Sequence, residues 1–305
     1  MPPALFGAIV LLVGIPAFAR PQSAPTCAGA PSVAEPFASS LADSGRVYGG
    51  AFTPDGATLY YFWKTSSDVR SEDYRIMRAR RENSWRSPQF VDLGGRYSDM
   101  YPVITADGRQ IVFSSYRPAP GDTATKPNAS LWMSRLEGDS FSSPEFLRLA
   151  NLLGSYHSQT AITADGRLQF RRTTADWKST EDLVARWNGV SFDRPTIVPE
   201  VARFRGWNSS MYVWGGRPGP ADGIALLEVS KLDSATRRRG PSELWVTLRS
   251  GNAWSEPRPL EAGVNDPHAF NNFAFFSPDG CELFFVRGFS RFYHVATQAA
   301  IGAHR

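Results

Sequence analysis

The sequence predicts an all-β protein, a five-bladed β-propeller of four-stranded antiparallel blades. Three observations predict it. A Thr/Ser-x-Asp-Gly string occurs four times, and an aromatic-x-x-Pro string recurs in register with it. The repeat period is about 50 to 60 residues, which suits one four-stranded propeller blade. The chain has 305 residues, of which 42% are hydrophobic and 13% aromatic, so it has ample material for a packed core.

The Asp-Gly strings predict one hairpin in each of four blades. An apolar, strand-like run follows each of them. Asp-Gly between two such runs is a strong hairpin signal, because Gly accepts positive φ and Asp caps the turn. The four strings are residues 53–56, 105–108, 163–166 and 277–280.

The aromatic-x-x-Pro strings predict the outer strand of each blade. Pro suits an edge strand because its missing N–H leaves no ladder bond unmade. In the unit between Pro195 and Pro257 the Asp-Gly string is less clear. There we expect the first strand at 210–214, an expanded turn and the second strand at 224–229. The four Pro strings are residues 85–88, 141–144, 192–195 and 254–257.

A strand from the N-terminus is expected to complete the last blade. The last unit shows three strands, whereas residues 35–41 form a surplus strand before the first unit. Pro36 precedes Asp55 by 19 residues, the same interval as from Pro88 to Asp107. A ring closed in this way has no free sheet edge. The propeller is therefore predicted over residues 35–298, with five blades.

The two cysteines fit this closure. Cys27 comes just before the closing strand, and Cys281 directly follows the Asp-Gly turn of the blade that this strand would complete. In an oxidising compartment we expect a Cys27–Cys281 disulfide that links the two ends of the ring. The alternative is a pair of free thiols.

The N-terminal residues predict export. Residues 1–19 contain an apolar run that ends in Ala-Phe-Ala, which is typical of a signal-peptidase site, and residues 20–34 form a Pro/Ala-rich linker. The run is too short for a comfortable membrane span, so we expect no span after cleavage. A periplasmic or secreted, monomeric protein is predicted.

The repeats resemble those of TolB-like β-propellers, relatives of the Trp-Asp-repeat propellers. The resemblance lies in strings such as DMYPVITADGRQIVFSSYR (99–117) and FAFFSPDGCELFFVRG (273–288), and it extends from Pro36 to the C-terminus. It implies the fold and is nearly silent on function. Such propellers include periplasmic adaptors that bind other proteins and the propeller parts of prolyl-peptidase-like enzymes. We expect no hydrolase domain in this chain.

The candidate ligand-binding residues lie where each inner strand begins. Equivalent positions in different blades converge on one end of the central channel, so polar and aromatic groups there would form a binding mouth. The alternative is a wet channel whose polar residues bind only water. The candidates are Asp99, Tyr101, His157, Gln159, Asn208, Asn271 and Asn272.

We therefore predict a non-enzymatic binding or scaffolding module, whose ligand is a protein, a peptide or a cell-envelope glycan. The alternative is a carbohydrate-active enzyme, a glycoside hydrolase or a metal-assisted lyase, with Asp99 and His157 in its site. No ligand spacing such as His-x-x-x-His supports a metal site, so neither a metal nor a cofactor is expected. The formal net charge of +4 is spread along the chain, which argues against nucleic acid as a partner.

Overall fold

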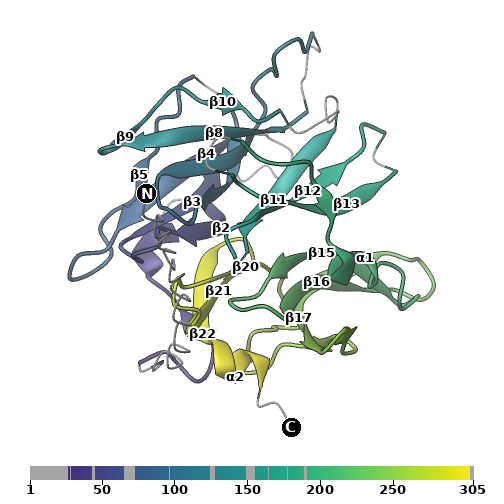
Figure 1. Cartoon of the computed structure of the whole chain (residues 1–305). Helices are drawn as coiled ribbons and strands as arrows, with labels where there is room; N and C mark the ends of the chain where they lie inside the picture. Colours follow the sequence, from purple (N-terminus) through teal and green to yellow (C-terminus); the bar gives the residue numbers. More distant parts are fainter. Residues whose placement is uncertain are drawn as a thin grey trace, which may run out of the picture.

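The predicted five-bladed propeller is confirmed. The computed structural model describes residues 27, 29–42, 45–64, 73–95, 97–123, 128–148, 155–163, 165–176, 178–188 and 191–302. Five small antiparallel sheets are arranged around a common centre (Figure 1). The predicted signal peptide, residues 1–19, lies outside the described residues, as does most of the predicted linker. No helix in the described ranges has both the length and the apolar character needed to cross a membrane.

The first three blades follow the predicted order of strands from the centre outward. Blade 2 carries one additional short strand, β9, which pairs with β8. Their strands are β2 (Arg46–Phe52), β3 (Thr58–Lys64), β4 (Tyr74–Arg80) and β5 (Gln89–Phe90) in blade 1; β6 (Asp99–Ile104), β7 (Gln110–Ser115), β8 (Ser130–Glu137), β9 (Ser140–Phe141) and β10 (Glu145–Phe146) in blade 2; and β11 (Tyr156–Ile162), β12 (Leu168–Thr173), β13 (Thr180–Ala185) and β14 (Thr196–Ile197) in blade 3.

Blades 4 and 5 complete the ring, and blade 5 takes its outer strand from the N-terminus. Three short helices, η1 (Ser39–Ala42), α1 (Pro199–Ala202) and α2 (Thr297–Ile301), lie outside the sheets. The strands are β15 (Met211–Pro218), β16 (Ile224–Leu232), β17 (Arg239–Ser250), β18 (Ala253–Trp254) and β19 (Arg258–Pro259) in blade 4, and β20 (Asn271–Phe276), β21 (Glu282–Arg287), β22 (Arg291–Ala296) and β1 (Glu35–Pro36) in blade 5.

Blade 4 is more regular than the sequence predicted. The expected first strand, 210–214, runs on through Gly215 and Gly216 to Pro218, so the turn before β16 is much shorter than expected. This turn also contains an Asp-Gly pair, in which Gly223 has a φ of +86°. The prolines on either side of Gly219 obscured the match to the other turns.

The hydrophobic core is divided among the spaces between blades. One aromatic-rich cluster joins blades 5, 1 and 2, and smaller clusters lie between blades 2 and 3, 3 and 4, and 4 and 5. Tyr61, Phe113 and Phe285 are fully buried in these clusters. The blades pack face to face, so strands buried on both sides, such as β3 and β16, read as nearly continuous apolar runs rather than as alternating ones.

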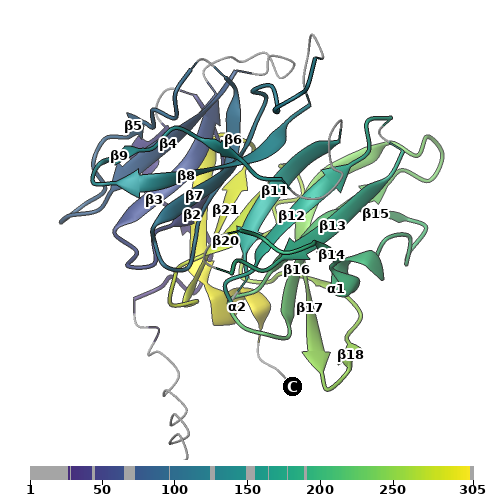
Figure 2. The ribbon, with the colours of Figure 1, turned by 45° about the horizontal axis from the view of Figure 1, so that its top comes forward.

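The N-terminal segment closes the ring as predicted. Strand β1 pairs with β22, with Glu35 opposite His294 and Pro36 opposite Tyr293. The Phe37 ring inserts between blades 5 and 1, at 4.8 Å from the ring of Phe284 and 5.6 Å from that of Trp85. Strands β2 and β20, from opposite ends of the chain, lie side by side in both views (Figures 1 and 2).

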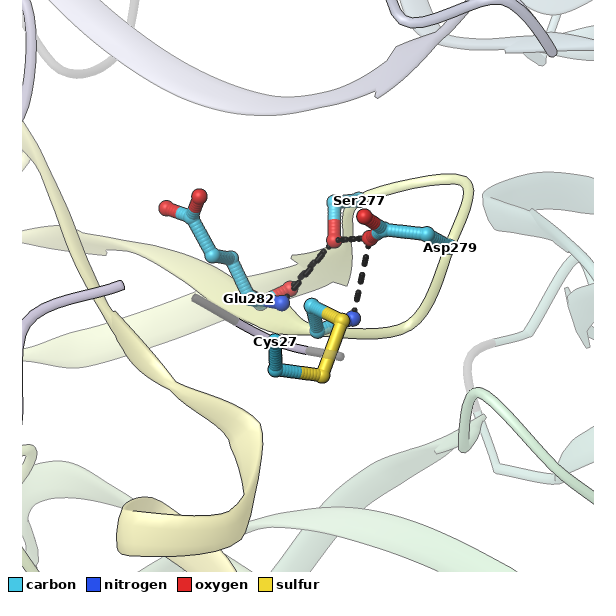
Figure 3. Close-up of a disulfide and its surroundings, with 5 residues drawn as sticks. Cys27, Ser277, Asp279 and Glu282 are labelled. Atoms are coloured by element: carbon cyan, nitrogen blue, oxygen red, sulfur yellow. Dashed lines mark hydrogen bonds between the residues drawn. A yellow bond between two sulfur atoms is a disulfide. The ribbon is translucent and has the colours of Figure 1, made fainter. Parts of the chain in front are cut away.

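The predicted Cys27–Cys281 disulfide is also present. The two Cα atoms are 5.2 Å apart across a sequence separation of 254 residues. Figure 3 shows the bond beside the Asp-Gly turn of blade 5, where the N–H of Cys281 donates to Asp279 Oδ1 at 3.0 Å. The disulfide thus joins the segment that precedes the closing strand to the blade that it completes.

Each of the four Thr/Ser-x-Asp-Gly turns is held by a similar set of hydrogen bonds. In blade 2, Thr105 Oγ1 donates to Asp107 Oδ1 at 2.6 Å, and the N–H of Gln110 donates to Thr105 Oγ1 at 3.1 Å. Ser277 and Asp279 form the equivalent bonds in blade 5 (Figure 3). The hydroxyl and the carboxylate therefore satisfy donors that the tight turn would leave unpaired, which explains why both positions recur.

The turns also pack against one another around one end of the channel. A Cβ atom on Gly280 would lie 2.7 Å from Cβ of Pro220 in the preceding blade. Gly56 faces Pro278 and Gly108 faces Pro54, where a Cβ atom would make ordinary contacts of 3.9 and 3.5 Å. All three glycines take a positive φ, and Gly280 in addition admits the turn of the neighbouring blade.

The disulfide should contribute measurably to stability. Replacing Cys27 and Cys281 by Ser removes a cross-link that restricts the unfolded chain. We therefore expect a loss of about 2–4 kcal/mol in the free energy of unfolding. Urea unfolding of the oxidised chain, the reduced chain and the double variant measures this loss. Equal midpoints for all three would contradict the expectation.

The contact between turns predicts different costs for two glycine substitutions. Gly251→Ala meets no atom within 4 Å and should cost only the strain of its positive φ, about 1–2 kcal/mol. Gly280→Ala has the same strain and also meets Pro220, so it should cost at least about 1 kcal/mol more. Urea unfolding compares the two variants, and equal losses would show that the turns do not support each other.

Candidate functional site

A cavity opens at the end of the channel where the Asp-Gly turns lie. Its volume is about 310 Å³. Every blade contributes the last residues of its inner strand and the first residues of the following turn. The lining residues are Gly50, Ala51, Phe52 and Pro54 of blade 1; Val103, Ile104, Thr105 and Ala106 of blade 2; Thr160, Ala161, Ile162 and Thr163 of blade 3; Arg217, Pro218, Gly219 and Pro220 of blade 4; and Ala274, Phe275, Phe276, Ser277 and Pro278 of blade 5.

The inner strands present backbone groups to this channel. Each inner strand is the edge strand of its sheet. The N–H and C=O groups on its channel-facing edge therefore have no partner within the blade. Side chains of neighbouring blades bind some of them. Thr160 Oγ1 donates to the carbonyl of Tyr101, and the N–H of Phe273 donates to Glu228 Oε1 at 2.7 Å.

A repeated β-bulge turns two aromatic side chains into the channel. Tyr101 and Phe273 lie at the bulges of β6 and β20 with φ of +51° and +55°, and their rings are 6.2 Å apart. Gly49 holds the equivalent place in blade 1, where a Cβ atom would lie 2.8 Å from Cβ of Phe273. The cavity lining begins one residue beyond Gly49 and Phe273, and two residues beyond Tyr101. The two rings and the close backbone of Gly49 therefore belong to the layer next to the residues that line the cavity.

The interface between blades 3 and 4 contains buried charged groups beside its apolar cluster. Arg171 is 7% exposed and bonds Asp182 Oδ1 at 3.4 Å, and Arg205 bonds the other carboxylate oxygen at 2.5 Å. Gln169 Nε2 donates to the carbonyl of Gly216 at 2.9 Å. A Cβ atom on Gly215 would lie 1.2 Å from the Arg171 guanidinium, so the glycine is what admits this cation.

Arg217 is the charged residue that reaches the cavity from this interface. Its side chain is 8% exposed, and Nη1 donates to the carbonyl of Thr160 at 3.2 Å. Its Nε has no partner among the described residues. Burial lowers the pKa of Arg217, an effect that the nearby Glu228 carboxylate opposes. The guanidinium remains charged at neutral pH in proteins.

Arg217 was not among the predicted site residues. The strand register places it opposite Leu226, at the position that Ala51, Val103, Ala161 and Phe275 hold in the other blades. Arg217 is a cation at a position where the other four repeats carry an apolar residue, and this departure from the repeat was a sequence signal of a functional position. It became visible only when the structure fixed the alignment of blade 4.

Asp99 and His157 lie at the opposite end, where the inner strands begin. Both Oδ atoms of Asp99 are 3.3 Å from Nη2 of Arg117, and burial raises the pKa of Asp99. His157 is 2% exposed with Nδ1 at 3.4 Å from the carbonyl of Ala129, and burial lowers its pKa to about 4. These two side chains are enclosed by the protein, and a role in ligand binding stays a prediction.

The asparagines among the candidates differ in their surroundings. Asn271 is fully buried, donates from Nδ2 to the carbonyls of Asp266 and Ala269, and accepts from Arg287 Nε at 3.1 Å. Asn272 is buried, and its Oδ1 has no partner in the described part of the chain. Asn208 is exposed in the turn before β15.

Tyr101 and Gln159, the remaining candidates, occupy equivalent bulges of blades 2 and 3. Gln159 has a φ of +52°, and its Oε1 lies 3.0 Å from the place of a Cβ on Gly215. Burial raises the pKa of Tyr101 well above its usual value. Both residues therefore belong to the layer that underlies the cavity. Their ligand-binding role stays a prediction, as it does for the asparagines.

No group of three or more metal-ligating side chains occurs within the described residues. His294 comes nearest to such a group, with Nδ1 at 2.7 Å from Glu282 and Nε2 at 3.5 Å from Glu35. These contacts link β21, β22 and β1. They therefore belong to the ring closure rather than to the cavity.

Comparisons with known proteins find similarity in fold alone. No protein-family model and no curated protein matches the chain. Similar solved structures include a putative TolB from Agrobacterium tumefaciens, with 16% identity and a TM-score of 0.44 over 80% of this chain and 70% of that one. A glycoside hydrolase has 9% identity and a TM-score of 0.50 over 87% and 90%.

Prolyl oligopeptidase B from Galerina marginata is also similar in part. It has 7% identity and a TM-score of 0.42, and the likeness covers 79% of this chain. The chain spans only 31% of the peptidase's length. The five-bladed propeller agrees with the fold that the TolB-like repeats imply, and these likenesses assign no activity to the chain.

Proposed function

We propose that this chain is an exported, non-enzymatic binding module, and that it holds a short peptide segment of a partner protein in the cavity at the Asp-Gly end of the channel. The observation that carries the proposal is the convergence of all five inner edge strands on one cavity of about 310 Å³. This volume lies at the small end of the range for ligand pockets and suits a few residues.

A peptide suits the lining better than the other ligands considered. Edge strands offer backbone N–H and C=O groups, which are the complement of a peptide backbone. Val103, Ile162 and Phe275 supply apolar walls between these groups. Glycan sites usually offer Trp or Tyr faces, and neither residue lines the cavity. The Cys27–Cys281 disulfide supports export, because such bonds persist in oxidising compartments.

Blocking the cavity tests the proposal. Ala106 is an exposed residue on the rim, so Ala106→Trp would fill the mouth without entering the core. Ile197→Trp is the matched control, since Ile197 is 53% exposed on β14, an outer strand away from the cavity. Binding of both variants and the native chain to an array of apolar hexapeptides is measured, and urea unfolding verifies that both variants fold.

We expect peptides bound with dissociation constants in about the micromolar range, weakened at least about tenfold by Ala106→Trp and unchanged by Ile197→Trp. Absence of any bound peptide, or equal binding by the two variants, would contradict the site. Cleavage of the peptides would contradict the non-enzymatic role. A glycan array with the same variants tests the remaining ligand class. Glycan binding that Ala106→Trp weakens would mean that the ligand is a glycan and not a peptide.

A further inference from the structure

Arg217 carries a buried positive charge that the protein balances only in part. It makes no ion pair with a carboxylate in the described part of the chain, and a single hydrogen bond to Thr160 uses one of its five N–H groups. Burying a cation without a close counter-ion is costly, and removal of water strengthens its attraction for an anion.

The surrounding charges leave an excess of one positive charge. Arg171, Arg205 and Arg217 face two carboxylates at this interface. Asp182 is bound by the first two guanidinium groups, and Glu228 accepts the N–H of Phe273. Arg217 is the one of the three that lines the cavity. A ligand that restores the balance therefore carries a single negative charge and reaches Arg217 through the cavity.

The size of the cavity decides which part of a peptide can reach Arg217. Its volume of about 310 Å³ has room for only a few residues, so a peptide that enters it presents one of its ends to Arg217. An N-terminal ammonium would repel the guanidinium. A C-terminal carboxylate has the required single charge, and its planar pair of oxygens matches the fork of N–H donors on Arg.

We propose that Arg217 binds the C-terminal carboxylate of an apolar peptide segment, a specificity that rests on the proposed peptide-binding function. The apolar walls near Arg217, Val103 and Ala161 among them, would surround the last side chains of this segment. A phosphate carries up to two negative charges, and the neighbouring Glu228 opposes the second. The site is therefore assigned to a carboxylate.

Two variants should change the affinity for an anion in opposite directions. Arg217→Met keeps the apolar stem and removes the charge, and replacing a buried, poorly paired cation by Met should not prevent folding. Glu228→Gln keeps the Oε1 acceptor for the N–H of Phe273 and removes the negative charge near Arg217. A residue with a purely structural role would not produce opposite effects on affinity for an anion.

The experiment uses tripeptides of Ala, Val, Leu and Phe as one library with free C-terminal carboxylates and one with C-terminal amides. Octanoate and inorganic phosphate are separate probes, and binding to the purified chain is measured by calorimetry. We expect the native chain to bind the acids at least about tenfold more tightly than the amides. Arg217→Met should abolish this preference, and Glu228→Gln should increase it about threefold or more.

The outcomes separate the inference from the function on which it rests. Equal binding of acids and amides to the native chain overturns the carboxylate site and leaves the peptide site standing. A preference that persists in Arg217→Met also overturns it. Binding of neither library overturns both. Octanoate or phosphate that binds more tightly than every tripeptide, and depends on Arg217, overturns the assignment to a peptide terminus.

Discussion

The structure depends on a constraint of connectivity: a ring of blades must close, and the two ends of the chain have to meet to close it. The N-terminal segment supplies β1 to blade 5, the Phe37 ring fills the space between blades 5 and 1, and the disulfide fixes the segment before β1 to the turn after β20. The residues that make each of these contacts are far apart in sequence and close in space. Without the N-terminal segment, β22 would be a free edge, and the interface of blades 5 and 1 would lose a buried aromatic ring.

Closure has a second consequence at the channel. Five inner edge strands then face a common axis, and their unpaired backbone groups require partners. The protein meets this requirement differently at the two ends. At the strand starts, buried pairs such as Asp99 with Arg117 fill the space. At the strand ends, the turns pack on one another and leave a cavity. The bulges that carry Tyr101 and Phe273 lie between the two regions.

Most of the fold could be predicted because the sequence features that determine it are local and repeated. The Thr/Ser-x-Asp-Gly turn carries its own hydrogen bonds, as Thr105 and Asp107 show, and the repeat interval located the closing strand at Pro36. The site could not be predicted in the same way. The polar residues at the strand starts stood out in the sequence, yet burial and pairing depend on which side chains neighbouring blades bring near. Arg217 was hidden because the prolines around Gly219 obscured the repeat in blade 4. Its surroundings depend on Gly215 of the same strand and on Arg171 and Glu228 from other strands.

The proposals for binding require that both ends of the chain form one closed ring. Residue-resolved amide hydrogen exchange tests this closure most directly. The N–H groups of Ala34, Phe37 and Ala296 donate to the carbonyls of Ala262, Phe292 and Pro31, bonds that exist only when the N-terminal segment is docked. These three amides should exchange at least about 100-fold more slowly than in an unfolded chain, and with similar protection to one another. Exchange at the unprotected rate for all three, with the inner strands still protected, would contradict the closed ring.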